Sequence, residues 1–154
     1  MTISAAQPRL ESWRQLGYAK MGSFGRLSGR SILVVEDEPL IAIGLQVLLE
    51  DEGADVEIAS NPSDALRLAD ETHFSAAILD FGSAGNEHAP LCRVLRAYAI
   101  TFMFYTGYHD VHASSSGAPI VTKPGSTEKL IATIAGLLAP PLQPASTSIA
   151  IEAV

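Results

Sequence analysis

The chain of 154 residues lacks several features, and each absence argues against a class of protein. Its single cysteine, Cys92, can form neither an internal disulfide nor a zinc site built from several thiols, which favours a reducing compartment. No run approaches the roughly 20 apolar residues of a membrane span, and the amino terminus lacks the pattern of a signal peptide. We therefore expect a cytoplasmic protein that does not associate with membranes.

Basic side chains are scarce beyond the first thirty positions. Residues 1–30 carry a net charge of +4, which leaves −11 for residues 31–154 out of a total of −7. A segment this acidic repels the phosphate backbone of nucleic acids, and we therefore expect no direct binding to DNA or RNA.

The first thirty residues mix Ser, Gly and basic side chains without apolar periodicity, which predicts a flexible basic leader with Met21 as an alternative translation start. Residues 140–154 are rich in Pro, Ser and Ala and predict a disordered tail, leaving 31–139 as one folded domain.

From residue 31 onwards, short apolar segments alternate with segments of helical periodicity. Strands are predicted over 32–35, 55–60, 75–81, 100–105 and 118–122, and helices from Pro39, from Pro62, over 89–99 and over 127–138. Near-continuous apolar strands separated by helices predict an α/β fold with a doubly wound, five-stranded parallel sheet and helices on both faces. Residues 109–117 are few and Ser-rich, so a helix there is expected to be short or mobile.

Polar side chains follow four of the five predicted strands. Glu36 and Asp37 follow the first, Asp80 lies at the carboxyl end of the third, Thr106 follows the fourth and Lys123 follows the fifth. In a parallel sheet these carboxyl ends meet at one edge, where ligands of doubly wound folds bind. Neighbouring carboxylates repel one another, so we expect a counterion, and Mg²⁺ suits hard carboxylate oxygens and leaves room for a phosphate oxygen.

This set of residues predicts transfer of a phosphoryl group to a carboxylate. With a metal ion neutralising Asp37 and Asp80, an oxygen of Asp80 can attack a phosphorus atom and form an aspartyl phosphate. Lys123 would balance the charge on the phosphoryl oxygens, Thr106 would donate a hydrogen bond to them, and Gly107 would leave space for them. We therefore predict Asp80 as the acceptor, with Lys123 and Thr106 as its catalytic partners.

The segment 31–138 resembles the receiver domain of bacterial response regulators. The matching motifs are 34–39 for the acidic turn, 78–80 for the acceptor, 106–107 for the switch hydroxyl and 122–124 for the lysine. The resemblance implies a flavodoxin-like strand order 2-1-3-4-5. It also implies a stand-alone regulator that is no true enzyme and takes its phosphoryl group from a histidine kinase or phosphotransfer protein. Its downstream protein is unknown, it could act as a homodimer, and its signal would pass through protein contacts or a phosphorelay.

The same resemblance implies that Mg²⁺ is required. The metal ligands would be Glu36, Asp37, Asp80 and the backbone carbonyl of Gly82. Residues 102–108 also resemble the fourth-strand signature of the FAT GUY subgroup of receivers, although Tyr105 replaces the usual small residue.

Two departures from the receiver pattern concern the signal that follows phosphorylation. Ile120 stands three residues before the lysine, where the family has its switch aromatic, so the ordinary hydroxyl–aromatic rotation cannot operate unchanged. Gly125 stands where a bulky aromatic is usual, and we expect it to loosen that corner.

Two other functions compete with a phospho-acceptor. A phosphatase of the haloacid-dehalogenase type also uses a strand-end aspartate, but it needs a second acid at position 82, where this chain has Gly82. A binding module independent of phosphorylation would keep the fold without the chemistry. On the first helix we expect at least one of Leu40 and Ile43 in the core, whereas their exposure would suit docking to the helical bundle of a kinase.

Overall fold

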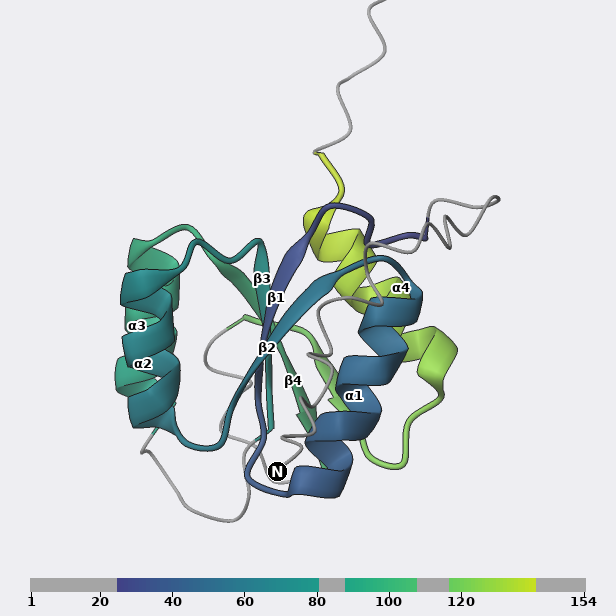
Figure 1. Cartoon of the computed structure of the whole chain (residues 1–154), viewed down its shortest axis with the longest axis horizontal. Helices are drawn as coiled ribbons and strands as arrows, with labels where there is room; N and C mark the ends of the chain where they lie inside the picture. The colour runs from purple at the N-terminus through teal and green to yellow at the C-terminus, as the bar shows by residue number, and fades with distance from the viewer. Residues whose placement is uncertain (1–24, 81–87, 108–116, 141–154) are drawn as a thin grey trace, which may run out of the picture.

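The computed structural model describes residues 25–80, 88–107 and 117–140. Within these ranges, five strands alternate with four helices (Figure 1). The strands are β1 (Ser31–Val35), β2 (Asp55–Ala59), β3 (Ala76–Leu79), β4 (Thr101–Thr106) and β5 (Ile120–Thr122). The helices are α1 (Pro39–Asp51), α2 (Pro62–Glu71), α3 (Ala89–Ala97) and α4 (Thr127–Leu138). None of these described helices is long and apolar enough to cross a membrane.

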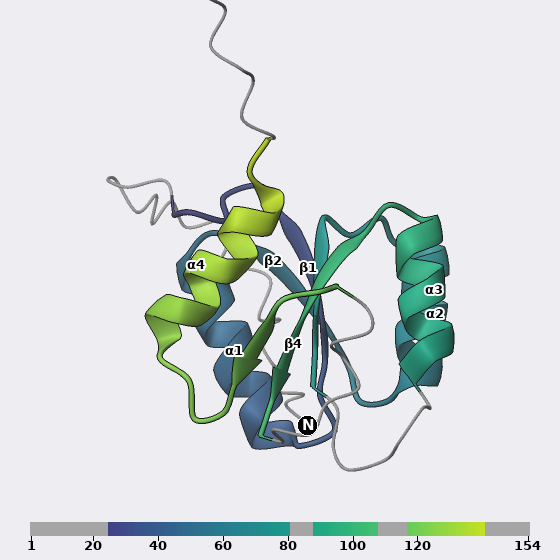
Figure 2. The same cartoon turned by 180° about the vertical axis from the view of Figure 1, so that it is seen from behind.

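The strands form one parallel sheet in the order β2-β1-β3-β4-β5. Helices α2 and α3 cover one face, and α1 and α4 cover the other (Figures 1 and 2). This confirms the predicted doubly wound sheet and its strand order. The short helix expected after Gly107 lies outside the described residues.

The sheet is held between two apolar layers because its central strands are buried on both faces. Leu33 and Val35 of β1 point to the layer under α2 and α3, while Ile32 and Val34 point to the layer under α1 and α4. Side-chain caps fix where two of the helices begin. Asn61 accepts a hydrogen bond from the Asp64 amide at 2.9 Å, and Ser126 caps α4 in the same way.

Helix α1 leaves an apolar stripe in solvent. Leu40, Ile43 and Val47 have exposed fractions of 80%, 53% and 55%. The prediction that Leu40 or Ile43 belongs to the core is therefore wrong. Ala42, Leu45 and Leu49 already occupy the inner face, and helical geometry places the exposed three on the opposite side.

The chain packs against the domain before β1 begins. Leu27 is fully buried in the layer beneath α1 and α4. Arg26 pairs with Glu52 at 3.3 Å and with Glu128 at 2.7 Å, which links the end of α1 to the start of α4. The last residues of the segment expected to be a flexible leader are thus part of the packed domain. Residues 1–24 and 141–154 lie outside the described residues, so the flexibility expected of them stays a prediction.

We expect Leu27→Ala to lower the free energy of unfolding by about 2–5 kcal/mol, because it empties a fully buried site. Leu40→Ala is the matched control, since it removes the same atoms from an exposed position and should change the value by less than about 0.5 kcal/mol. Urea denaturation of the full chain measures both. Equal effects of the two substitutions would contradict the packing of Leu27.

Candidate functional site

The Lys123 ammonium joins two carboxylates from different strand ends. Its Nζ donates to Glu36 Oε2 at 2.8 Å and also to Asp80 Oδ2. Glu36 directly follows β1 and Asp80 directly follows β3, and the register between these strands pairs Val35 with Leu79. The parallel sheet therefore brings the two acids side by side, as the sequence predicted, and Lys123 reaches them from the end of β5.

Asp37 completes a cluster of three carboxylates with Glu36 and Asp80. One oxygen from each lies within 4.8 Å of the others. Counted as ionised, they carry three negative charges against the single positive charge of Lys123. Hard carboxylate oxygens in a group this close are ligands that suit Mg²⁺, and a divalent ion would neutralise the two remaining charges. The cluster thus fits a magnesium ion.

Burial and mutual contacts shift the pKa values of Glu36 and Lys123. The Glu36 side chain is 1% exposed, and burial, followed by its contact with Asp80, raises its pKa above the ordinary value. Lys123 and the Glu38 amide act in the opposite direction, but more weakly. Burial lowers the pKa of Lys123, yet its hydrogen bonds to Asp80 and Glu36 outweigh burial and the net direction is upward. Lys123 therefore stays positively charged at neutral pH.

Thr106 and Gly107 lie at the same edge of the sheet. The carbonyl of Thr106 accepts a hydrogen bond from the Lys123 amide at 2.8 Å, which ties the ends of β4 and β5 together. The Thr106 side chain is buried. Among the described residues, a Cβ at Gly107 would come no closer than 4.0 Å to another atom, Lys123 Cβ, which agrees with the space expected beside this glycine. Gly82, the expected carbonyl ligand, lies outside the described residues.

The corner after Lys123 is tight, so the expectation that Gly125 loosens it is wrong. A Cβ at this position would lie 2.8 Å from the Thr122 carbonyl oxygen and 2.9 Å from Val121 Cγ1. Both distances are too short for a real contact. Gly125 therefore allows the chain to fold closely back over the end of β5.

The sequence motifs did not reveal one neighbour of the site, Tyr105. The Lys123 ammonium lies 5.1 Å from the centre of the Tyr105 ring. Side chains alternate along β4, so Tyr105 lies on the face of the sheet opposite to Thr106. This alternation is the sequence signal from which the position of Tyr105 could have been predicted.

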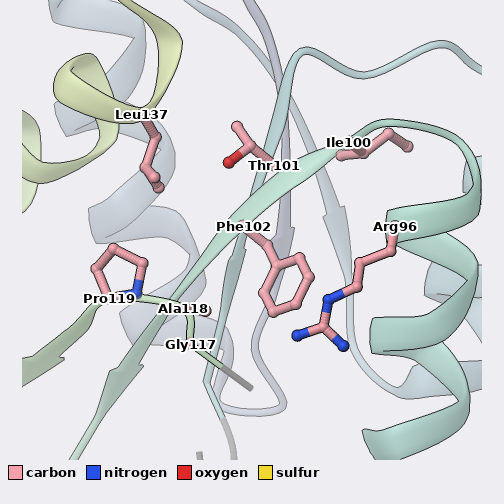
Figure 3. Close-up of a pocket in the computed structure, with 8 residues that line it drawn as sticks. All are labelled: Arg96, Ile100, Thr101, Phe102, Gly117, Ala118, Pro119 and Leu137. Atoms are coloured by element: carbon pink, nitrogen blue, oxygen red, sulfur yellow. The ribbon is translucent and has the colours of Figure 1, made fainter. Parts of the chain in front are cut away.

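A hollow lies at the other end of β4, away from the carboxylates. It has a volume of about 220 Å³ and is lined by Thr101, Phe102, Arg96 and residues just before β5 (Figure 3). The Arg96 guanidinium lies over the Phe102 ring, 5.3 Å from its centre. This hollow is separate from the carboxylates and contributes nothing to their chemistry.

Comparison with known proteins finds a matching family model, a curated relative and similar solved structures. The family model described as "response regulator receiver domain" matches residues 32–135. The DNA-binding response regulator MtrA of Mycolicibacterium smegmatis is 33% identical over 109 residues, which are 67% of this chain and 48% of that protein. The chain thus spans about half the length of this curated relative.

Solved structures agree with the family match. The response regulator protein TrrA from Thermotoga maritima, in complex with Mg²⁺ and BeF, is 27% identical with a TM-score of 0.63, covering 71% of this chain and 99% of that one. A CheY-like receiver domain protein from Methanospirillum hungatei is 25% identical with a TM-score of 0.64, covering 71% and 93%.

We expect Asp37→Asn to weaken Mg²⁺ binding by at least about tenfold, because it removes a charged oxygen ligand from the cluster. Asp51→Asn makes the same chemical change at the far end of α1 and should leave the affinity unchanged. Isothermal titration calorimetry with MgCl₂ measures the Mg²⁺ affinity of the wild type and of each variant. Equal affinities of the Asp37 variant and the wild type would rule out a metal ion held by this cluster.

Proposed function

The chain belongs to the response regulator receiver domain family, and from this we propose that Asp80 accepts a phosphoryl group in a Mg²⁺-dependent reaction. The observation that carries the proposal is the position of Lys123, whose ammonium contacts both Asp80 and Glu36 at the edge where the carboxylates gather. A lysine in this position can follow the phosphoryl oxygens when Asp80 is modified.

The proposed reaction is an exchange at phosphorus. An Asp80 oxygen forms a bond to the phosphorus atom of a phosphohistidine, and the bond from phosphorus to the histidine nitrogen breaks. Lys123 neutralises charge on the phosphoryl oxygens, and Thr106 donates its hydroxyl proton in a hydrogen bond to them. Gly107 leaves the space that these oxygens require.

Glu36, Asp37 and Asp80 would hold the magnesium ion, together with the carbonyl of Gly82. When bound, the ion lowers the repulsion between the carboxylates and the incoming phosphoryl oxygens. The similar TrrA structure is a complex with Mg²⁺ and BeF, which supports this part of the proposal.

The proposed phosphoryl donor is a histidine kinase or a histidine phosphotransfer protein, and the signal passes on through protein contacts or a relay. The acidic charge of residues 31–154 argues against direct DNA contact by this domain, even though the relative MtrA is DNA-binding. A cytoplasmic location, a homodimer and membership of the FAT GUY subgroup belong to the same proposal.

The family match favours a receiver over the haloacid-dehalogenase alternative. A binding module that acts independently of phosphorylation differs from a receiver in one testable respect, because its Asp80 would not accept a phosphoryl group.

We expect the wild type to gain one phosphoryl group when it is incubated with acetyl phosphate and Mg²⁺, because the acceptor, its lysine and the metal ligands lie together. Asp80→Asn should gain none, whereas Asp55→Asn, at the exposed start of β2, should behave as the wild type. Intact mass spectrometry reads all three. A wild type that gains no phosphoryl group would support the binding-module alternative.

The exposed stripe of Leu40, Ile43 and Val47 on α1 is the proposed docking surface for the donor. It begins four residues after Glu36, so a helical partner bound there would lie beside the carboxylates. Exposed apolar side chains of this kind mark binding surfaces when they are contiguous.

We expect Ile43→Asp to slow phosphoryl transfer from a histidine kinase that phosphorylates the wild type by about tenfold or more, because it places a charge in an apolar contact. Its rate with acetyl phosphate should not change, since that donor needs no docking. Arg67→Asp, on the exposed face of α2, is the control for adding an acidic side chain. Equal slowing with both donors would show that the site, and not docking, had been damaged.

A further inference from the structure

Tyr105, which replaces a small residue of the fourth-strand signature, lies beside the lysine of the site. The Lys123 ammonium is 5.1 Å from the centre of the Tyr105 ring, within the range of a cation–π interaction. Tyr105 itself is partly buried, so its ring is partly shielded from water. The ammonium can be attracted to the ring while it keeps its hydrogen bonds to the carboxylates.

The strand register explains how the two side chains meet. Tyr105 of β4 pairs with Val121 of β5, and both belong to the layer under α1 and α4. Lys123 follows Val121 by two positions, so its side chain leaves the chain on the same face. Adjacent strands bring such diagonal neighbours within reach of long and aromatic side chains. The ring is therefore placed beside the lysine by the sheet itself.

Gly125 also lies near the Tyr105 ring. A Cβ at Gly125 would lie 3.6 Å from Tyr105 Cε2, in ordinary contact, and it would collide with the Thr122 carbonyl and Val121. Glycine at this position therefore keeps the chain close to the end of β5, near the Tyr105 ring.

Lys123 consequently has partners of two kinds. The carboxylates of Asp80 and Glu36 accept hydrogen bonds from its ammonium, and these bonds must rearrange when a phosphoryl group arrives on Asp80. The Tyr105 ring is chemically unchanged by phosphorylation and attracts the ammonium before and after transfer. Ile120, at the position of the family's switch aromatic, supplies no ring and is partly exposed.

We propose that Tyr105 is a positioning residue, whose ring holds the Lys123 ammonium over the acceptor carboxylate so that it can follow the phosphoryl oxygens. This inference rests on the proposed function, because it assigns a role in phosphoryl transfer to Asp80. It predicts that the chemistry requires an aromatic ring at position 105 but not a hydroxyl group.

The experiment compares Tyr105→Phe with two non-aromatic variants, Tyr105→Leu and Tyr105→Met. With acetyl phosphate and Mg²⁺, the phenylalanine variant should be phosphorylated at the wild-type rate, and the non-aromatic variants about two- to fivefold more slowly. Tyr98→Leu is the matched control, because it removes an exposed tyrosine at the end of α3 and should have no effect. Rates of Tyr105→Leu and Tyr105→Met equal to the wild-type rate would overturn the proposal.

Nuclear magnetic resonance tests the contact directly in the wild type, independently of any effect of the substitutions on folding. The side-chain methylene protons of Lys123 should be shifted upfield by the ring current, and the shift should persist in Tyr105→Phe. Unshifted Lys123 methylene protons in the wild type would overturn the contact. If the wild type shows the shift but gains no phosphoryl group, the proposed function fails while the contact stands. If it gains the group without the shift, the function stands and the role of Tyr105 fails.

Discussion

The contact of the Lys123 ammonium with the carboxylates of Glu36 and Asp80 is the interaction on which this site depends. Two carboxylates that are 1% and 11% exposed repel each other strongly unless a cation lies between them. The cation arrives from β5, while the acids arrive from β1 and β3, so the site exists only where these strands end at the same edge. The parallel sheet supplies that condition through its register, and the two apolar layers hold the sheet in place.

Much of this arrangement could be predicted from the sequence because it depends on local signals. An apolar strand that ends in a polar residue identifies both the strand and the edge at which its last side chain lies, as for Asp80 and Lys123. What the sequence did not reveal depends on packing between distant segments. The burial of Leu27 requires α1 and α4 to be in position, and the exposure of Leu40 follows from Ala42, Leu45 and Leu49 occupying the inner face.

The end of the sheet at β4 and β5 departs from the family pattern in a coordinated way. The usual aromatic position holds Ile120, the residue after Lys123-Pro124 is Gly125, and an aromatic ring is instead at position 105, one residue before Thr106. In the folded chain Lys123 and Gly125 both lie near the Tyr105 ring. Tyr105 thus brings an aromatic ring beside the lysine from β4. In the proposed reaction, the lysine that meets the phosphoryl oxygens also contacts the strand that carries Thr106.

The central claim is that Asp80 carries the phosphoryl group. It is tested most directly by phosphorylating the full chain with acetyl phosphate and Mg²⁺, reducing the product with borohydride and sequencing its peptides by mass spectrometry. Borohydride converts the acyl phosphate of an aspartate into homoserine, which marks the modified position permanently. We expect homoserine at position 80, in place of Asp80, and at no other aspartate. Homoserine at position 37 instead, or at no position, would contradict it.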